Sequence, residues 1–308
     1  MTVIKLRAFF AAVAVLIFLT ISSAHAQTGY NSLFIGHSFF VPFANGMPFY
    51  TAQAGITDHA QTVVFSGGAS GAPQALWEDA AHAAEIKAVL DGGDVELFAM
   101  TYAGEYPTTE GYINWINYAL DKNPNTRIAV AMPWLDFPAM LTATEYANSL
   151  NLSHDIGWRN FIAELSALYP TTDIFSIPHG LAAVELRLLL DADNLPDIDF
   201  LTGDASNSLF VDVKGHAGNM LKALGRLVWL SAIYDVDLEM FSYDPGYATD
   251  LKVIAQTIMD ESNAPPVYSA TVPAVPLLGL AVLSGLLALI EVVAIKVRLH
   301  NAPRQIEV

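Results

Sequence analysis

Five short apolar stretches, each followed by a segment with helical spacing, constrain the fold of this 308-residue chain most strongly. This alternation is typical of β-α-β units, in which helices bury both faces of a parallel sheet. The expected strands are residues 33–36, 62–66, 95–101, 127–132 and 173–177. The expected helices are residues 42–55, 73–90, 110–122, 153–169, 180–190 and 216–234. We therefore expect an α/β fold around a five-stranded parallel sheet.

The N-terminus carries an apolar segment outside this pattern. Lys5 and Arg7 precede an apolar run over residues 8–20 and a small-residue site that ends at Ala26, which is the pattern of a secretion signal. The alternative is an uncleaved anchor, but the run is short for a membrane span. We expect residues 1–26 to be a signal peptide and the protein to be exported.

The C-terminus carries a second apolar run, residues 272–295, which is interrupted by Glu291 and followed by a basic tail over residues 296–308. This run is long enough to cross a bilayer, with the tail in the cytoplasm. A buried core helix is less favoured, because the run is apolar on all faces. With Val-Pro-Ala-Val-Pro at residues 272–276, the segment resembles bacterial C-terminal sorting signals of the PEP-CTERM type. That resemblance implies a protein anchored in the cell envelope or released from it after processing.

Between these ends we expect one large domain over residues 27–240, then an acidic, aromatic extension and linker over residues 241–271. Residues 27–271 contain only nine of the 14 Lys and Arg residues but 29 of the 31 Asp and Glu residues, a net charge of −20. Such a surface repels nucleic acid and anionic lipid, and it suits a neutral substrate. The chain has no cysteine, so its core must be stable without disulfides.

The candidate catalytic residues lie after the first expected strand and before the last expected helix. Ser38 follows the strand, and Asp212 and His216 share the sequence Asp-Val-Lys-Gly-His. The carboxyl ends of parallel strands meet at one rim of the sheet, and this loop can reach that rim. A serine hydroxyl attacks an ester when a histidine takes its proton and an acid orients the histidine. Ser38, His216 and Asp212 are therefore the candidate nucleophile, base and orienting acid.

Structural alternatives to these roles stay open at this stage. Ser38 is equally placed to cap the following helix, and Asp212 and His216 to be unrelated residues of a surface loop. The Gly-x-Ser-x-Gly elbow of α/β-hydrolases is absent, because residue 40 is phenylalanine. Ser70, in the glycine-rich loop after the second strand, is a weaker rival nucleophile.

Further candidates follow other strands at the same rim. The backbone N–H of Gly68 is suited to an oxyanion, although a strand-to-helix turn is the commoner use of such a glycine. Trp134 is either a wall of the substrate pocket or a core residue, and His37 is a candidate substrate-binding residue. His179 is expected either to be structural or to support the site residues from behind them. We expect no metal and no cofactor, because neither metal-binding histidine spacing nor a nucleotide-binding fingerprint is present.

In order and spacing, residues 31–234 resemble the SGNH (GDSL-like) hydrolases. The resemblance rests on Gly36, His37, Ser38, Gly68, Asp212 and His216. It implies a three-layer α/β/α, flavodoxin-like fold, ester hydrolysis, and an oxyanion hole made by the N–H groups of Ser38 and Gly68 with an asparagine after the third strand. That asparagine is missing, since residues 100–105 read Met-Thr-Tyr-Ala-Gly-Glu, and the acid-to-histidine spacing is one residue longer. We expect Thr101 or a main-chain N–H to replace it.

The sequence thus predicts an exported serine esterase whose substrate is an ester, such as an acetyl ester on carbohydrate, and which has no nucleic-acid partner. One alternative is an acyltransferase that acts on exported polysaccharide. The other is a non-catalytic surface or carbohydrate-binding protein on the same fold, which the missing asparagine favours.

Overall fold

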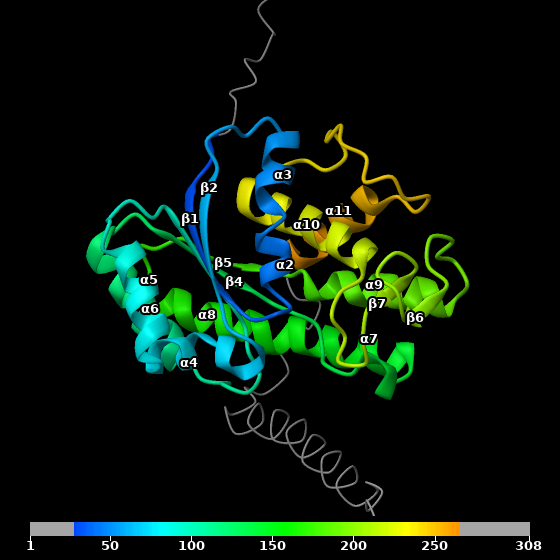
Figure 1. Cartoon of the computed structure of the whole chain (residues 1–308), viewed down its shortest axis with the longest axis horizontal. Helices are drawn as coiled ribbons and strands as arrows, with labels where there is room; N and C mark the ends of the chain where they lie inside the picture. The colour runs from blue at the N-terminus through cyan, green and yellow to red at the C-terminus, as the bar shows by residue number, and fades with distance from the viewer. Residues whose placement is uncertain (1–27, 265–308) are drawn as a thin grey trace, which may run out of the picture.

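The computed structural model describes residues 28–264, and a five-stranded parallel sheet lies at its centre (Figure 1). The predicted signal peptide, the apolar C-terminal segment and the basic tail lie outside the described residues. Among residues 28–264, no helix has both the length and the apolar composition that a membrane crossing requires.

The five predicted strands are confirmed. They are β1 (Asn31–Gly36), β2 (Ala60–Phe65), β3 (Leu97–Thr101), β4 (Arg127–Ala131) and β5 (Ile174–Ile177). They lie in the order β2-β1-β3-β4-β5, and every neighbouring pair is parallel. The central strands β1 and β3 are covered on both faces, which explains why they are continuous apolar runs instead of alternating ones.

Helices cover both faces of the sheet (Figure 1), which gives the predicted three-layer α/β/α fold. One face carries α4 (Pro73–Glu78), α5 (Ala80–Leu90), α6 (Glu110–Lys122) and α8 (Arg159–Leu168). The other carries α2 (Val41–Ala44), α3 (Met47–Gln53), α9 (Gly180–Asp191), α10 (Asn219–Tyr234) and α11 (Leu251–Asn263). This arrangement is consistent with the fold that the resemblance to SGNH hydrolases implies.

Several helices differ from the prediction in extent. The expected helix over residues 73–90 is two helices, because Asp79 adopts an extended conformation and its carboxylate accepts a hydrogen bond from the backbone N–H of His82 at 2.9 Å. The expected helix over residues 42–55 breaks at Gly46, and this break is the one that Gly46 and Pro48 predict for its first turn. The helix expected from residue 153 is the end of a longer helical segment, made of α7 (Ala143–Leu152), the π-helix η3 (Ser153–Trp158) and α8.

An aromatic cluster on α10 fixes the segment that follows β1. The Trp229 ring packs edge-on against Phe34 and Phe40, at centroid distances of 5.6 and 4.9 Å, and it stacks with Phe43 at 6.3 Å. All four side chains are fully buried. Because Phe40 and Phe43 flank the start of α2, this packing holds the turn between β1 and α2 in place.

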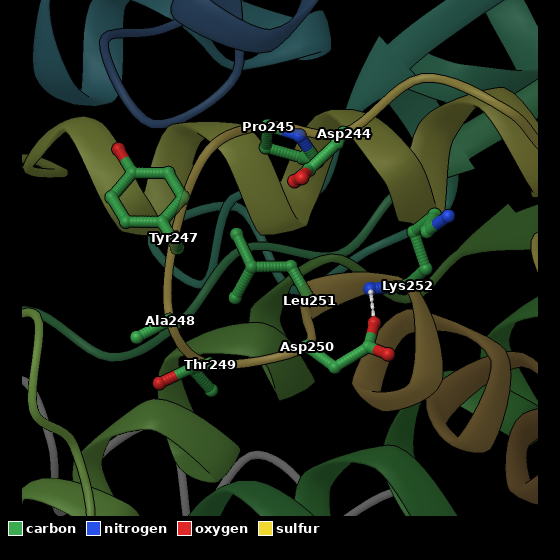
Figure 2. Close-up of a pocket in the computed structure, with 8 residues that line it drawn as sticks. All are labelled: Asp244, Pro245, Tyr247, Ala248, Thr249, Asp250, Leu251 and Lys252. Carbon is green, nitrogen blue, oxygen red and sulfur yellow. Dashed lines mark hydrogen bonds between the residues drawn. The ribbon is translucent and has the colours of Figure 1, made fainter.

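The segment predicted as an extension and linker contains α11, which packs against α9 and α10. A cavity of about 260 Å³ lies in front of it (Figure 2), lined by residues 244–252. Several of its polar groups are already paired: Asp250 caps α11 through the N–H groups of Lys252 and Val253, and the Lys252 ammonium donates to the carbonyl of Phe241. We assign no function to this cavity.

Trp229 tests the importance of this cluster for stability. Trp229→Ala should lower the free energy of unfolding by about 3–5 kcal/mol, because it leaves a large cavity among buried rings. Trp229→Phe should cost less than half as much, since it keeps most of the ring and removes an indole N–H that has no hydrogen-bond partner in the described part of the chain. Urea unfolding measures both, and equal losses would contradict the packing described here.

Candidate active site

Ser38 lies two residues beyond the end of β1, at the carboxyl rim of the sheet. Gly36 is required there for space, since a Cβ atom at this position would lie 2.7 Å from the Phe40 ring. The next helix, α2, begins at Val41 with Phe40 as its N-cap and has no side-chain cap. Ser38 is therefore not the helix cap, and its hydroxyl is available for another partner.

The loop that carries Asp212 and His216 is closed on itself. It follows the small parallel pair β6 (Phe200–Thr202) and β7 (Ser208–Phe210), and a bridge between Phe210 and Ala217 brings its ends together. The N–H of Val211 donates to the carbonyl of His216 at 2.8 Å. Gly215 completes the turn with φ +103°, in the region that only glycine adopts readily.

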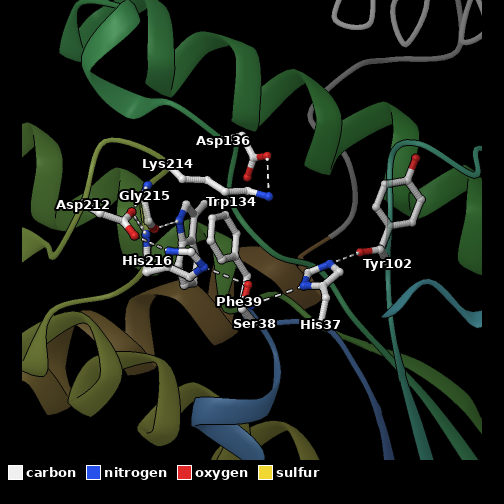
Figure 3. A network of polar contacts seen from close by, with 10 residues as sticks. All are labelled: His37, Ser38, Phe39, Tyr102, Trp134, Asp136, Asp212, Lys214, Gly215 and His216. Carbon is white, nitrogen blue, oxygen red and sulfur yellow. Dashed lines mark hydrogen bonds and ion pairs between the residues drawn. The ribbon is translucent and has the colours of Figure 1, made fainter. Parts of the chain in front are cut away.

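This loop brings His216 to Ser38 across 178 positions of sequence (Figure 3). The Ser38 Oγ lies 2.8 Å from Nε2 of His216, and Nδ1 of His216 lies 2.6 Å from Oδ2 of Asp212. An ionised carboxylate only accepts hydrogen bonds, so Nδ1 carries the imidazole proton. Nε2 is then an acceptor, and the Ser38 hydroxyl donates to it. We call this arrangement the Ser38 chain.

The Asp212 carboxylate organises its own loop as well as the histidine. Its Oδ1 accepts the backbone N–H groups of Gly215 and His216, at 3.0 and 3.2 Å. Partial burial acts to raise the pKa of Asp212, but the hydrogen bonds from His216 and Gly215 outweigh it and hold the pKa below its ordinary value. The carboxylate is thus kept charged beside the imidazole.

Aromatic rings hold the imidazole from the other side. Phe39 packs edge-on against His216 at a centroid distance of 5.1 Å and stacks on Trp134 at 4.8 Å. The Trp134 indole donates to the carbonyl of Gly215 at 2.8 Å, which ties the loop to the end of β4. Only 3 % of Trp134 is exposed, so it lies beneath the site as a core residue and offers little surface to a substrate.

His37 and Thr101 form a brace beside Ser38. Nδ1 of His37 accepts the N–H of Phe39, and Nε2 lies 3.2 Å from the carbonyl of Tyr102 and from the Thr101 hydroxyl. Burial lowers the pKa of His37, which favours the neutral ring. Thr101 is completely buried and its hydroxyl can donate to the Tyr102 carbonyl. Thr101 therefore lies beneath His37 and does not reach the surface above Ser38.

Gly68 lies at the same rim of the sheet as the serine, because β1 and β2 are parallel neighbours in register, with Gly36 opposite Phe65. Gly68 starts the short 3-10 helix η1 (Gly68–Gly71) with φ +55°. At the other end of η1, a Cβ at Gly71 would lie 2.8 Å from the Cα of His37, so the loop is in close contact with the Ser38 turn. In the described part of the chain, the N–H groups of Ser38 and Gly68 donate to no backbone or side-chain acceptor.

A second hydrogen-bonded set of one serine, one histidine and one aspartate lies between η3 and α11. His154 contacts Asp155 Oδ1 through Nδ1 and Ser262 Oγ through Nε2, both at 2.9 Å. Ser262 lies in the last turn of α11, where its backbone N–H is used within the helix. The N–H of Ser262 is thus not free, and the contact serves to hold α11 against η3, with help from hydrogen bonds of Arg159 to the carbonyls of Glu261 and Ala264.

Other histidines and metal-binding groups do not extend the site. His179 is fully buried against Phe43, Trp134 and Trp229, and burial lowers its pKa to about 4, so it is a neutral core residue as predicted. Across residues 28–264, no three His, Asp or Glu side chains are grouped to hold a metal ion.

Two residues near Ser38 were not predicted from the sequence. Phe39 contacts both His216 and Trp134, and Lys214 extends from the histidine loop toward Asp136, with Nζ 3.5 Å from its carboxylate (Figure 3). The position of Lys214 between Asp212 and His216 was the only available signal for it.

Comparisons with known proteins add a likeness in fold. No protein-family model matches the chain, and no curated protein matches it in sequence. The periplasmic domain of a lipopolysaccharide acetyltransferase from Salmonella ser. Paratyphi A is 14% identical, with a TM-score of 0.39, over 70% of this chain and 86% of that one. A DUF4886 family protein from Bacteroides uniformis is 12% identical, with a TM-score of 0.47, over 78% of this chain and 98% of that one. Both are similarities of overall fold, and neither bears on function.

The hydrogen bonds of Asp212 predict a pH-dependent contribution to stability. Because its pKa is lowered on folding, the stabilisation is present above the unfolded pKa of about 3.9 and is lost as the pH falls through the folded pKa. Asp212→Asn should therefore be less stable than wild type at pH 7, and the difference should shrink near about pH 3.

Urea unfolding at the two pH values measures this difference. Asp58→Asn is the control, since Asp58 is exposed and, among the described residues, its carboxylate accepts a hydrogen bond from the adjacent Thr57 hydroxyl alone. An equal difference between wild type and Asp212→Asn at both pH values would contradict the role given to these hydrogen bonds.

Proposed function

We propose that this protein is a serine esterase that hydrolyses a neutral ester through an acyl-enzyme on Ser38. The observation that carries the proposal is the Ser38 chain: a serine hydroxyl 2.8 Å from an imidazole whose other nitrogen lies 2.6 Å from a carboxylate. In this geometry histidine can take the serine proton as the hydroxyl attacks, and the carboxylate stabilises the imidazolium that forms.

In the first half-reaction, Ser38 Oγ bonds to the ester carbonyl carbon and its proton moves to Nε2 of His216. The electron pair of the carbonyl bond moves to the carbonyl oxygen, which becomes an oxyanion. When that pair returns, the bond to the alcohol oxygen breaks, and the leaving alcohol takes the proton from His216. Asp212 keeps Nδ1 protonated throughout, so Nε2 alternates between accepting and donating.

In the second half-reaction, water takes the place of the alcohol. The oxygen of the water molecule attacks the acyl carbon while His216 accepts a proton from that water. The bond between Ser38 Oγ and the acyl carbon then breaks, the acid leaves, and His216 returns the proton to Ser38 Oγ. The unpaired N–H groups of Ser38 and Gly68 are the proposed donors to the oxyanion in both halves. If a sugar hydroxyl replaced water, the same steps would give an acyltransferase.

The surroundings of the Ser38 chain support an uncharged ester. Val213, beside Asp212, is 62% exposed, and Met140, in the turn that contacts the histidine loop, is 61% exposed. The N–H of Phe137 in that turn donates to the carbonyl of Lys214 at 2.9 Å. Exposed apolar side chains suit an acyl or alkyl group, and the acidic composition disfavours strongly anionic substrates.

We also propose that the protein acts outside the cytoplasm. This part of the proposal rests on the N-terminal signal pattern and on the apolar segment at residues 272–295, both of which are sequence predictions.

Ser38→Ala tests the proposal. It should reduce turnover of short-chain nitrophenyl esters by about 10⁶-fold, to near the background rate, because the nucleophile is removed. It should also abolish covalent labelling by a fluorophosphonate probe. Ser262→Ala is the matched control, since Ser262 also contacts a histidine that is paired with an aspartate, and both its activity and its labelling should match those of wild type.

The opposite results have clear meanings. Undiminished turnover in Ser38→Ala would rule out the proposed nucleophile. Absence of labelling in a folded wild-type protein that binds glycans would instead favour the non-catalytic reading. An acylated sugar formed in preference to free acid would identify an acyltransferase.

A further inference from the structure

The Lys214 side chain extends from the histidine loop, and its ammonium lies close to Gly68. Its Nζ is 3.8 Å from the position that a Cβ atom of Gly68 would occupy. It is also 3.5 Å from Oδ2 of Asp136 (Figure 3). One short loop thus carries the acid, this cation and the histidine at positions 212, 214 and 216. His216 contacts the serine hydroxyl, and Lys214 reaches the neighbouring glycine.

We propose that the Lys214 ammonium is a catalytic residue that donates to the oxyanion, as a third group beside the N–H groups of Ser38 and Gly68. This inference rests on the proposed acyl transfer at Ser38. A negative charge develops on the ester oxygen only after attack, so a positive group held near it lowers the barrier more than it tightens substrate binding.

The ion pair with Asp136 positions the ammonium, and the backbone of Lys214 is held on its carbonyl side. Its carbonyl accepts the N–H of Phe137, and its neighbour Gly215 is in close contact with Pro138, since a Cβ at Gly215 would lie 2.8 Å from the proline Cδ. Asp136 belongs to the same turn and is a positioning residue that holds the ammonium at its working place.

The alternative donor from the sequence is not placed for this role. The Thr101 hydroxyl lies beneath His37, is fully buried and can donate to the Tyr102 carbonyl. The ammonium is instead partly open to solvent, with 37% of the Lys214 side chain exposed. Its electrostatic influence also reaches His37, whose pKa it helps to lower. A molecule in the solvent can therefore reach the Lys214 ammonium.

The test compares Lys214→Met with Lys122→Met. Lys122 is the matched control, because its ammonium is also 3.5 Å from an aspartate, Asp91, and its side chain is 32% exposed. On a neutral nitrophenyl ester, Lys214→Met should lower kcat by about 10²-fold with little change in KM, as expected for loss of one oxyanion donor. Lys122→Met should match wild type, and Lys214→Arg should recover part of the loss.

The affinity for a boronic acid is a second measurement, and it would not change if Lys214 had only a structural role. A short alkylboronic acid forms a tetrahedral anion on the serine, so its affinity should fall in Lys214→Met by a factor similar to that in kcat. Thermal melting of each variant checks the fold. If Lys214→Met melts early, Lys214→Gln, which keeps a polar end, should show the same kcat and boronate losses.

The outcomes separate this inference from the proposed function. If Ser38→Ala abolishes turnover while Lys214→Met keeps wild-type kcat and boronate affinity, this inference is overturned and the esterase remains. A rise in KM confined to anionic esters would also overturn it, since Lys214 would then bind a substrate group. If wild type shows no Ser38-dependent turnover, both proposals fall.

Discussion

The carboxylate of Asp212 is the group on which the rest of the site depends. One oxygen accepts two backbone N–H groups of its own loop, and the other accepts the imidazole N–H of His216. The same side chain therefore sets the shape of the loop, the tautomer of the histidine and the direction of its free nitrogen. Gly215 completes the turn between acid and histidine in a left-handed conformation.

The sheet supplies the second constraint, because it brings Ser38 and the backbone N–H of Gly68 to one rim. Their strands are neighbours and run in register, so the residues that follow them leave the sheet side by side. Phe39 and Trp134 then connect this rim to the histidine loop by stacking and by one indole hydrogen bond. Rigid elements thus position all the groups, as a preorganised site requires.

The sheet and the grouping of the three candidate catalytic residues were predictable from sequence patterns. The five strands and the meeting of Ser38 with His216 and Asp212 follow from apolar periodicity and from the geometry of parallel sheets. The helix break at Asp79 was not predicted, because the apolar pattern continues through it while the capping bond depends on local conformation. α11 was not predicted, because its apolar face is recognisable as such only when the helices that it packs against, α9 and α10, are known. The roles of Thr101 and Lys214 depend on side-chain direction, which spacing does not encode.

The contact between His154 and Ser262 has a consequence for recognising enzymes by shape. It reproduces the distances of the Ser38 chain within a few tenths of an ångström, yet its serine belongs to a regular helical turn whose main-chain donors are occupied. A search template built from three side chains would return both places in this molecule. Adding the N–H groups of Ser38 and Gly68, which donate to no acceptor among the described residues, would leave only the site at Ser38 within residues 28–264, so the discriminating part of such a template is the polypeptide backbone.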